Sequence, residues 1–110
     1  MSQRPLQEPA FLILTALAGG AQHGYGITAD AGQISGGRVR LRAGTLYAAL
    51  DRLGDDGLVE VDHEEVVDGR LRRYYQLTEA GAQRLASEVA RLRANTTAAA
   101  QRLGLIAGTP

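Results

Sequence analysis

The fold of this chain is decided by the stretch RLRAGTLYAALDRLGDDGLVEVDHEEVVDGRLRRYYQL, residues 40–77. Its first part predicts a helix, because three leucines recur at three- and four-residue spacing and would form one buried stripe. These leucines are Leu46, Leu50 and Leu53, and Gly57 is the expected end of the helix. The opposite face is small and carries one arginine; it consists of Gly44, Ala48 and Arg52, with Thr45 and Tyr47 on its flanks. Such a slim face lets a helix approach another surface closely, and a solvated helix face is the alternative.

The second part of the stretch predicts two alternating strands around Asp68-Gly69, a dipeptide that suits the tight turn of a β-hairpin. Arg70 would lie at the hairpin tip, with Arg72 and Arg73 on the return strand. An arginine-tipped hairpin after a slim-faced helix is the layout of a winged helix-turn-helix, whose helix enters the major groove of DNA while the wing contacts the backbone or minor groove. A surface hairpin whose arginines balance nearby acids is the alternative.

Two further helices are expected before this stretch. Pro9 suits a first helical position, and residues 10–18 are apolar on nearly every face. A chain of this size is expected to cover one side of that helix, so a second copy would cover the other side and would contact Phe11 and Leu14. The second helix is predicted over residues 25–34.

The segment HGYGITADAG, residues 23–32, has glycines at a spacing that loosely matches a dinucleotide-binding loop. That loop requires a preceding strand within a βαβ unit, which the surrounding pattern does not offer. We therefore interpret the segment as a glycine turn between two helices, with His23 as a packing or capping residue.

These segments, taken in order, resemble the PadR family of bacterial transcriptional regulators. The resemblance rests on HGYGI (23–27), GTLYAALDRLGDDGLVE (44–60) and GRLRRYYQLTEAG (69–81). It implies a winged-helix domain and one C-terminal helix that forms a homodimer, and in most members repression. Relatives often have a capping residue where this chain has Arg42, which leaves the helix start less well defined. Some multidrug-sensing relatives stack flat ligands on a tryptophan, which this chain lacks, so that mode of binding is not carried over.

The last segment predicts a long helix that begins after Thr78, a good capping residue. Its apolar and small positions alternate three and four apart, as in a coiled-coil seam, and they are Ala82, Leu85, Val89, Leu92, Thr96, Ala99, Leu103 and Ile106. We expect a dimer interface made of Phe11, Leu14, Leu85, Val89, Leu92, Thr96, Ala99 and Leu103. A helix that folds back on its own domain is the alternative. The expected fold is mainly α with a small β-hairpin: a DNA-binding winged helix-turn-helix over residues 1–78, a dimerisation helix over residues 79–106, and a flexible tail over residues 107–110.

Composition limits the function classes. The chain has 110 residues, no cysteine and a formal net charge of zero, which indicates one domain in the reducing cytoplasm. All twelve basic residues are arginines, and six lie in residues 38–42 and 69–73, so a neutral chain can still have a local positive face. A secretion signal over residues 10–18 is the alternative to a cytoplasmic location, but Glu8 and Pro9 directly before the apolar run argue against it. No run is long enough to span a membrane.

No enzyme site, cofactor or metal site is expected. No serine sits in a nucleophile elbow. The run Asp62, His63, Glu64 and Glu65 contains metal-binding residue types, but alternation along a strand would send neighbours to opposite faces.

The hypothesis from sequence is a homodimeric, cytoplasmic repressor that binds double-stranded DNA, with a small apolar or aromatic effector as a further partner. Each recognition helix would enter successive major grooves. The expected DNA-binding residues are Arg40, Arg42, Gly44, Thr45, Tyr47, Ala48, Arg52, Arg70, Arg72 and Arg73, while Asp51 and Asp55 should tilt away from the DNA backbone. The alternatives are a winged-helix module that binds protein and an apolar-ligand sensor that does not bind DNA directly.

Overall fold

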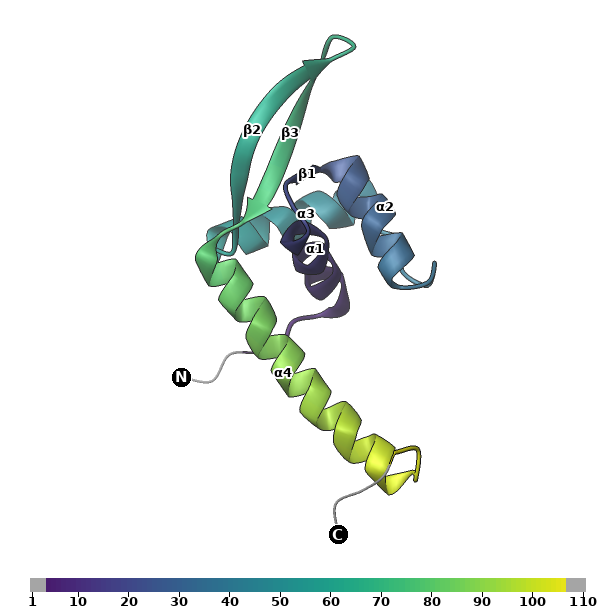
Figure 1. The fold of residues 1–110 in the computed structure, drawn as a ribbon. Coiled ribbons are helices and arrows are strands. Elements are labelled where there is room, and N and C mark those ends of the chain that lie inside the picture. The colour runs from purple at the N-terminus through teal and green to yellow at the C-terminus, as the bar shows by residue number, and fades with distance from the viewer. Residues whose placement is uncertain (1–3, 107–110) are drawn as a thin grey trace.

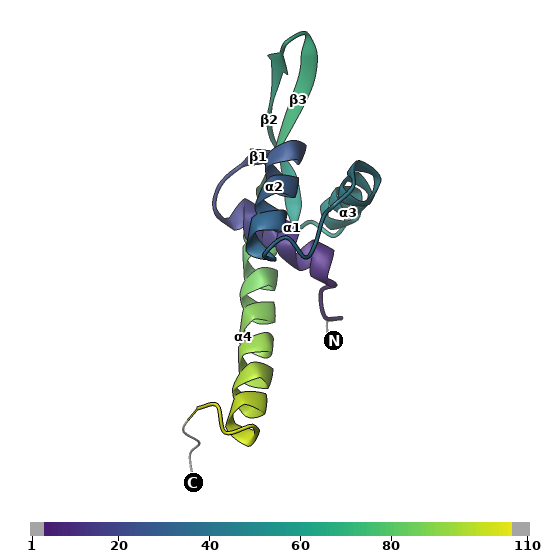
Figure 2. The same cartoon turned by 90° about the vertical axis from the view of Figure 1, so that its right-hand side faces the viewer.

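The computed structural model describes residues 4–106, and Figure 1 shows their arrangement. Its elements, in chain order, are α1 (Glu8–Ala18), β1 (Gln22–His23), α2 (Gly24–Ile34), α3 (Ala43–Asp55), β2 (Val59–Val67), β3 (Arg70–Leu77) and α4 (Glu79–Arg102). The strands form one antiparallel sheet in the order β1-β3-β2. The β2–β3 hairpin rises on one side of the first three helices, and α4 leaves on the other side (Figures 1 and 2). The predicted winged helix-turn-helix is confirmed, and the short β1 adds a third strand.

The first helix is covered by its own chain. It contacts α2, α3, α4 and β3, and Ile13 and Leu14 are fully buried. The expectation that one chain could cover only one side of this helix is therefore wrong, because β3 and α4 complete the cover that α2 and α3 begin. Leu14 cannot face a second copy in this conformation, whereas Phe11 remains half-buried.

The third helix is fixed by its leucine stripe and by a glycine stop. The buried stripe consists of Leu46, Leu50 and Leu53, as the spacing predicted. At the end of the helix the Leu58 N–H donates to the Leu53 carbonyl over 2.9 Å, and Gly57 adopts a φ of 76°. This is a Schellman stop, which requires a left-handed residue where the sequence has glycine. Arg42 stands at the N-cap without a side-chain cap bond, and the helix still begins at Ala43.

The wing turns where the sequence predicted. Asp68 and Gly69 have φ values of 51° and 76°, as a two-residue type I′ turn requires. At the base of the wing, Gln22 and His23 of β1 pair with Tyr75 and Tyr74 of β3. This pairing attaches the hairpin to the start of α2.

The last helix begins in close contact with the turn between α3 and β2. The Thr78 hydroxyl accepts a hydrogen bond from the Gly81 N–H over 3.0 Å and donates to the Gly57 carbonyl over 2.6 Å. A Cβ at Gly81 would overlap the Leu58 carbonyl oxygen. A glycine is therefore needed here so that α4 can pack against the backbone of this turn.

Residues 4–7 attach the N-terminal segment to α4. The Leu6 N–H donates to a carboxylate oxygen of Glu88 over 2.6 Å, and the Arg84 guanidinium donates to the Arg4 carbonyl. Arg91 donates to both oxygens of Glu88 over 3.0 and 2.9 Å. Glu88 is only 5% exposed and is held by these three hydrogen bonds.

Beyond Glu88 the last helix projects away from the other elements (Figure 1). The helix ends at Arg102 with Gly104 at a φ of 74°, four residues before the predicted boundary. Ile106 therefore lies off the helix, and its predicted place in the seam is wrong. The predicted tail, residues 107–110, lies outside the described residues. Within residues 4–106 no helix combines the length and apolarity that a membrane crossing needs.

Candidate nucleic-acid interface

The outward face of α3 is exposed, as the sequence predicted. Its small and polar members are Gly44, Thr45, Ala48 and Arg52. Tyr47 is 47% exposed and lies on the side nearer the wing. Asp51 and Asp55 are also exposed, and their helical spacing from Gly44 and Ala48 places them on the same outward side. The face therefore combines small residues with one arginine and two acids.

In the loop before α3, apolar side chains that point into the protein alternate with exposed arginines. Val39 is half-buried and Leu41 is buried, whereas Arg40 and Arg42 are exposed. Arg38 differs from them because it forms an ion pair with Glu8 at the start of α1. Arg40 and Arg42 are thus available beside the N-terminus of α3, and within residues 4–106 neither forms an ion pair.

The three wing arginines occupy different environments. Arg70 is exposed, Arg72 is half-buried, and Arg73 is exposed but paired with Glu64 over 3.1 Å. The hydrogen bond to Glu64, followed by that to Tyr75, raises the pKa of Arg73 above its ordinary value. Among the described residues, Arg70 and Arg72 form no ion pair. The guanidinium groups of these two arginines are therefore available to bind an anionic ligand.

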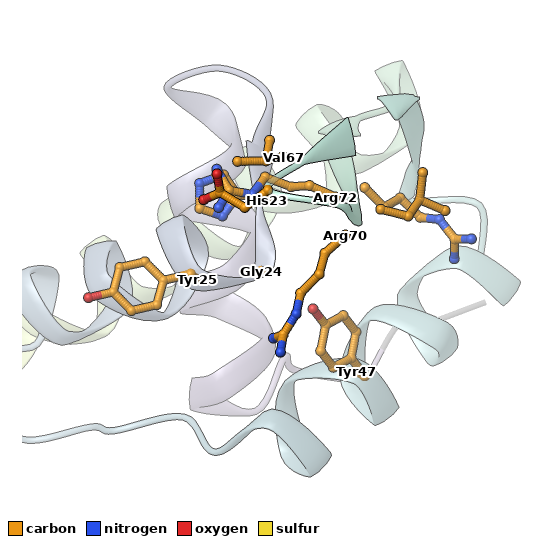
Figure 3. Close-up of a pocket in the computed structure, with 10 residues that line it drawn as sticks. His23, Gly24, Tyr25, Tyr47, Val67, Arg70 and Arg72 are labelled. Atoms are coloured by element: carbon orange, nitrogen blue, oxygen red, sulfur yellow. The ribbon is translucent and has the colours of Figure 1, made fainter. Parts of the chain in front are cut away.

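A cleft of about 450 Å³ separates the wing from the first turns of α2 and α3. Its lining includes Gly24 and Tyr25 of α2, Tyr47 of α3, and Arg70 and Arg72 of β3. In Figure 3 the Arg70 side chain extends from the wing toward α3, and the Tyr47 hydroxyl points toward that side chain. The structure thus brings together Tyr47 and two wing arginines that the sequence assigned to separate elements.

His23 caps α2, as expected. Its Nδ1 accepts a hydrogen bond from the Gly26 N–H over 3.2 Å. Its ring meets Tyr74 edge to face at 5.3 Å, and Tyr74 in turn stacks on His63 at 4.3 Å. Burial, followed by the charge of Arg72, lowers the pKa of His23, so the ring caps the helix as a neutral imidazole at neutral pH. These aromatic contacts connect the wing to the cap of α2.

The acidic run on β2 does not alternate as expected. A register shift between Val61 and His63 brings the neighbours Asp62 and His63 together over 2.6 Å. The expectation that neighbours point to opposite faces is wrong for this pair, because a bulge adds a residue to one strand. From His63 onward the alternation holds, and His63 contacts Glu65, two residues away, over 3.3 Å. The bond to Asp62, aided by Glu65, raises the pKa of His63. Among the described residues no group of three or more has a geometry suited to a metal ion.

Sequence reasoning missed a second groove, on the other flank of α3. About 580 Å³ in volume, it lies between α3, the N-terminal segment and the start of α4. Thr45, Ala48 and Arg52 line one side, and Arg4 and Arg84 line the other. Arg4 and Arg84 are 80 positions apart in the sequence, and no local pattern indicates that they meet.

The predicted dimer residues of α4 are exposed, with one exception. Leu85 is half-buried and packs against the core of its own chain. Val89 and Leu92 are 37% and 38% exposed, Leu103 is 72% exposed, and Thr96 and Ala99 lie between them in solvent. An apolar stripe therefore follows the part of α4 that leaves the other elements.

Comparison with known proteins gives consistent matches. Residues 13–87 match the family described as "Transcriptional regulator PadR-like family". A transcriptional regulator from Mycobacterium tuberculosis is 44% identical over 69 residues, which are 63% of this chain and 61% of that protein. The chain thus spans about three-fifths of the length of this curated relative.

Solved structures share the fold. A PadR family regulator from Clostridium difficile is 27% identical with a TM-score of 0.72, covering 88% of this chain and 99% of that one. Bacillus subtilis PadR, solved in complex with operator DNA, is 24% identical with a TM-score of 0.67, covering 76% of this chain and 48% of that one.

Proposed function

Because the chain belongs to the PadR-like family of transcriptional regulators, we propose that it binds specific sites in double-stranded DNA as a homodimer and represses transcription. The observation that carries the proposal is the cleft shared by the recognition helix and the wing. Tyr47 of α3 lines the same space as Arg70 and Arg72 of β3, so helix and wing would meet one duplex together. The operator complex of Bacillus subtilis PadR supports DNA as the partner.

The roles of individual residues follow from their positions. Gly44 and Ala48 have no side chain beyond Cβ, so the α3 backbone would enter the major groove closely. Arg52, on the same face, and Thr45, on its flank, would reach base edges. Arg40 and Arg42 would contact phosphates beside its N-terminus, and the wing would add Arg70, Arg72 and, once Glu64 releases it, Arg73.

The homodimer is supported by the shape of the chain. A compact domain of this length would have a radius of gyration of about 13 Å, whereas the Cα atoms of this chain give 16.3 Å. The difference reflects the second half of α4, whose apolar stripe is uncovered. A helix standing alone in water is marginally stable, so a partner helix against Val89, Leu92 and Leu103 would stabilise it. Two recognition helices would then address half-sites about one helical turn apart.

Repression relieved by a small apolar or aromatic effector is part of the same proposal. The groove beside α3 has apolar lining from Leu6, Pro9 and Leu58, with Arg52 among its polar residues. A ligand in this groove would compete with DNA for Arg52. A thermal-shift screen with flat aromatic compounds, followed by measurement of DNA binding in their presence, tests the effector proposal.

We also propose that the DNA-binding domain ends at Thr78, because α4 begins at the next residue.

A mobility-shift titration over a range of salt concentrations tests DNA binding. Arg72→Ala should weaken binding to every duplex and lower the salt slope by about one unit, because one phosphate contact is lost. Arg52→Ala should also relax the preference among sequences. Arg93→Ala is the matched control, since it removes one exposed arginine from α4 and should leave binding unchanged. Equal binding by all three variants and the wild type would refute the assignment of this face.

A further inference from the structure

The position of Tyr47 is set by a glycine on the neighbouring helix. A Cβ built on Gly24 would lie 2.5 Å from the Tyr47 hydroxyl oxygen, 3.1 Å from its Cζ and 3.3 Å from Leu46 Cδ2. The end of the tyrosine ring therefore rests on the first residue of α2. In this position the hydroxyl lies against the start of α2 and points toward the wing (Figure 3).

The other side of the hydroxyl faces a cleft whose lining has a net positive charge. The Arg70 guanidinium extends from the wing toward it (Figure 3), and Arg72 lines the same cleft. Asp68, in the hairpin turn, is the one acid in the described lining, against three arginines, of which only Arg73 is paired. A hydroxyl donor and two available guanidiniums that converge on one space fit an anion with several acceptor oxygens.

We propose that this cleft binds one phosphate of the DNA backbone, held jointly by the Tyr47 hydroxyl and the Arg70 guanidinium, with Gly24 as the residue that positions Tyr47. The inference rests on the proposed function. A helix in the major groove and a wing in the adjacent minor groove are separated by one sugar-phosphate strand, and that strand must cross the space between them. Tyr47 would thus contact the DNA backbone and would not distinguish between base sequences. The bound phosphate would contact both the wing and the recognition helix.

The test uses duplexes recovered from genomic DNA by the wild-type protein and, beside them, an unrelated duplex. Tyr47→Phe removes only the hydroxyl, and we expect affinity to fall about threefold to tenfold on all duplexes, with their ranking unchanged. Thr97→Val is the matched control: it removes one exposed hydroxyl from α4, outside the cleft, so the affinity of this variant should equal that of the wild type. A changed ranking with Tyr47→Phe, or unchanged affinity, would overturn the inference.

A second variant tests the positioning role. Gly24→Ala removes no donor, and alanine favours a helix. Because the new Cβ would also press on Leu46, only a loss of affinity that is absent in the Tyr47→Phe background would arise from the displaced tyrosine. We expect Gly24→Ala to reproduce the defect of Tyr47→Phe, and the double variant to be no weaker than either single one. A thermal midpoint measured beside each titration verifies folding. If Gly24→Ala misfolds, the Tyr47→Phe result decides the inference by itself.

Neutral methylphosphonate linkages locate the phosphate. One linkage in each half-site should weaken the wild type when neutralised, yet leave the Tyr47→Phe and Arg70→Ala double variant unaffected. If no linkage behaves this way while the wild type binds DNA, the inference fails and the proposed function stands. If the wild type binds no duplex at all, the proposed function fails and the inference fails with it.

Discussion

Replacing Glu88 with alanine tests how α4 is fixed to the winged-helix domain. The substitution removes a buried carboxylate that accepts one bond from the Leu6 backbone and two from Arg91. A charge-assisted bond to a backbone N–H contributes about 2 kcal/mol, and the pair with the exposed Arg91 adds little. The free energy of unfolding should therefore fall by about 2 kcal/mol, which lowers the thermal midpoint of a domain of this size by about 8 °C.

The pH dependence of the same variant follows from the ionisation of Glu88. The bonds from Arg91, and then the Leu6 N–H, hold its pKa below the ordinary value despite burial. A lowered carboxyl pKa contributes stability that is fully present above the ordinary glutamate range and is lost as pH falls through that range toward the folded pKa. The difference between wild type and Glu88→Ala should therefore be largest near neutral pH and should shrink in acid.

Urea titrations followed by circular dichroism, at about pH 7 and about pH 3, measure both effects. Protein concentration is held constant because a dimer makes apparent stability depend on concentration. Glu79→Gln is the control: Glu79 is an exposed acid in the first turn of α4, and its loss should cost about 0.5 kcal/mol. A Glu88→Ala effect no larger than that of the control, or one equal at both pH values, would refute the role assigned to Glu88.

Three other changes test separate parts of the structure. Gly81→Ala should destabilise the protein by about 3 kcal/mol, because the new Cβ meets the Leu58 carbonyl; a thermal midpoint within a degree or two of wild type would contradict this packing. Leu92→Asp should convert the proposed dimer to a monomer in analytical ultracentrifugation, and an unchanged sedimentation coefficient would exclude α4 as the interface. NMR titration should give His63 a pKa above that of an unperturbed imidazole, and Asp62→Asn should lower it toward that value; no change on substitution would show that the Asp62 bond is not formed in solution.

Local patterns predicted the elements well, because each depends on contacts between residues close in sequence. The leucine stripe of α3, the Asp68-Gly69 turn and the Thr78 cap each involve only a few consecutive residues, and the structure confirms them. The family resemblance, carried by the same segments, is also confirmed. The early end of α4 at Arg102 shows the limit of the seam pattern, which continues past the glycine that stops the helix.

What could not be predicted depends on residues far apart in the chain. The burial of Leu14 requires β3 and α4 to pack on α1, and the two-residue strand β1 exists only because β3 pairs with it. The close approach of Tyr47 to Gly24 joins two helices and gives no periodic signal. The bulge that brings Asp62 to His63 is likewise a feature of strand pairing. The DNA-binding residues, and the dimer residues other than the buried Leu14, remain predictions.

Footprinting of the wild-type protein on genomic fragments that it selects tests the central claim most directly. The account predicts a protected site with two-fold symmetry, two half-sites about one helical turn apart, two chains per site, and affinity that falls steeply with salt. Selection of no fragment above background, or binding of one chain to an asymmetric site, would contradict it.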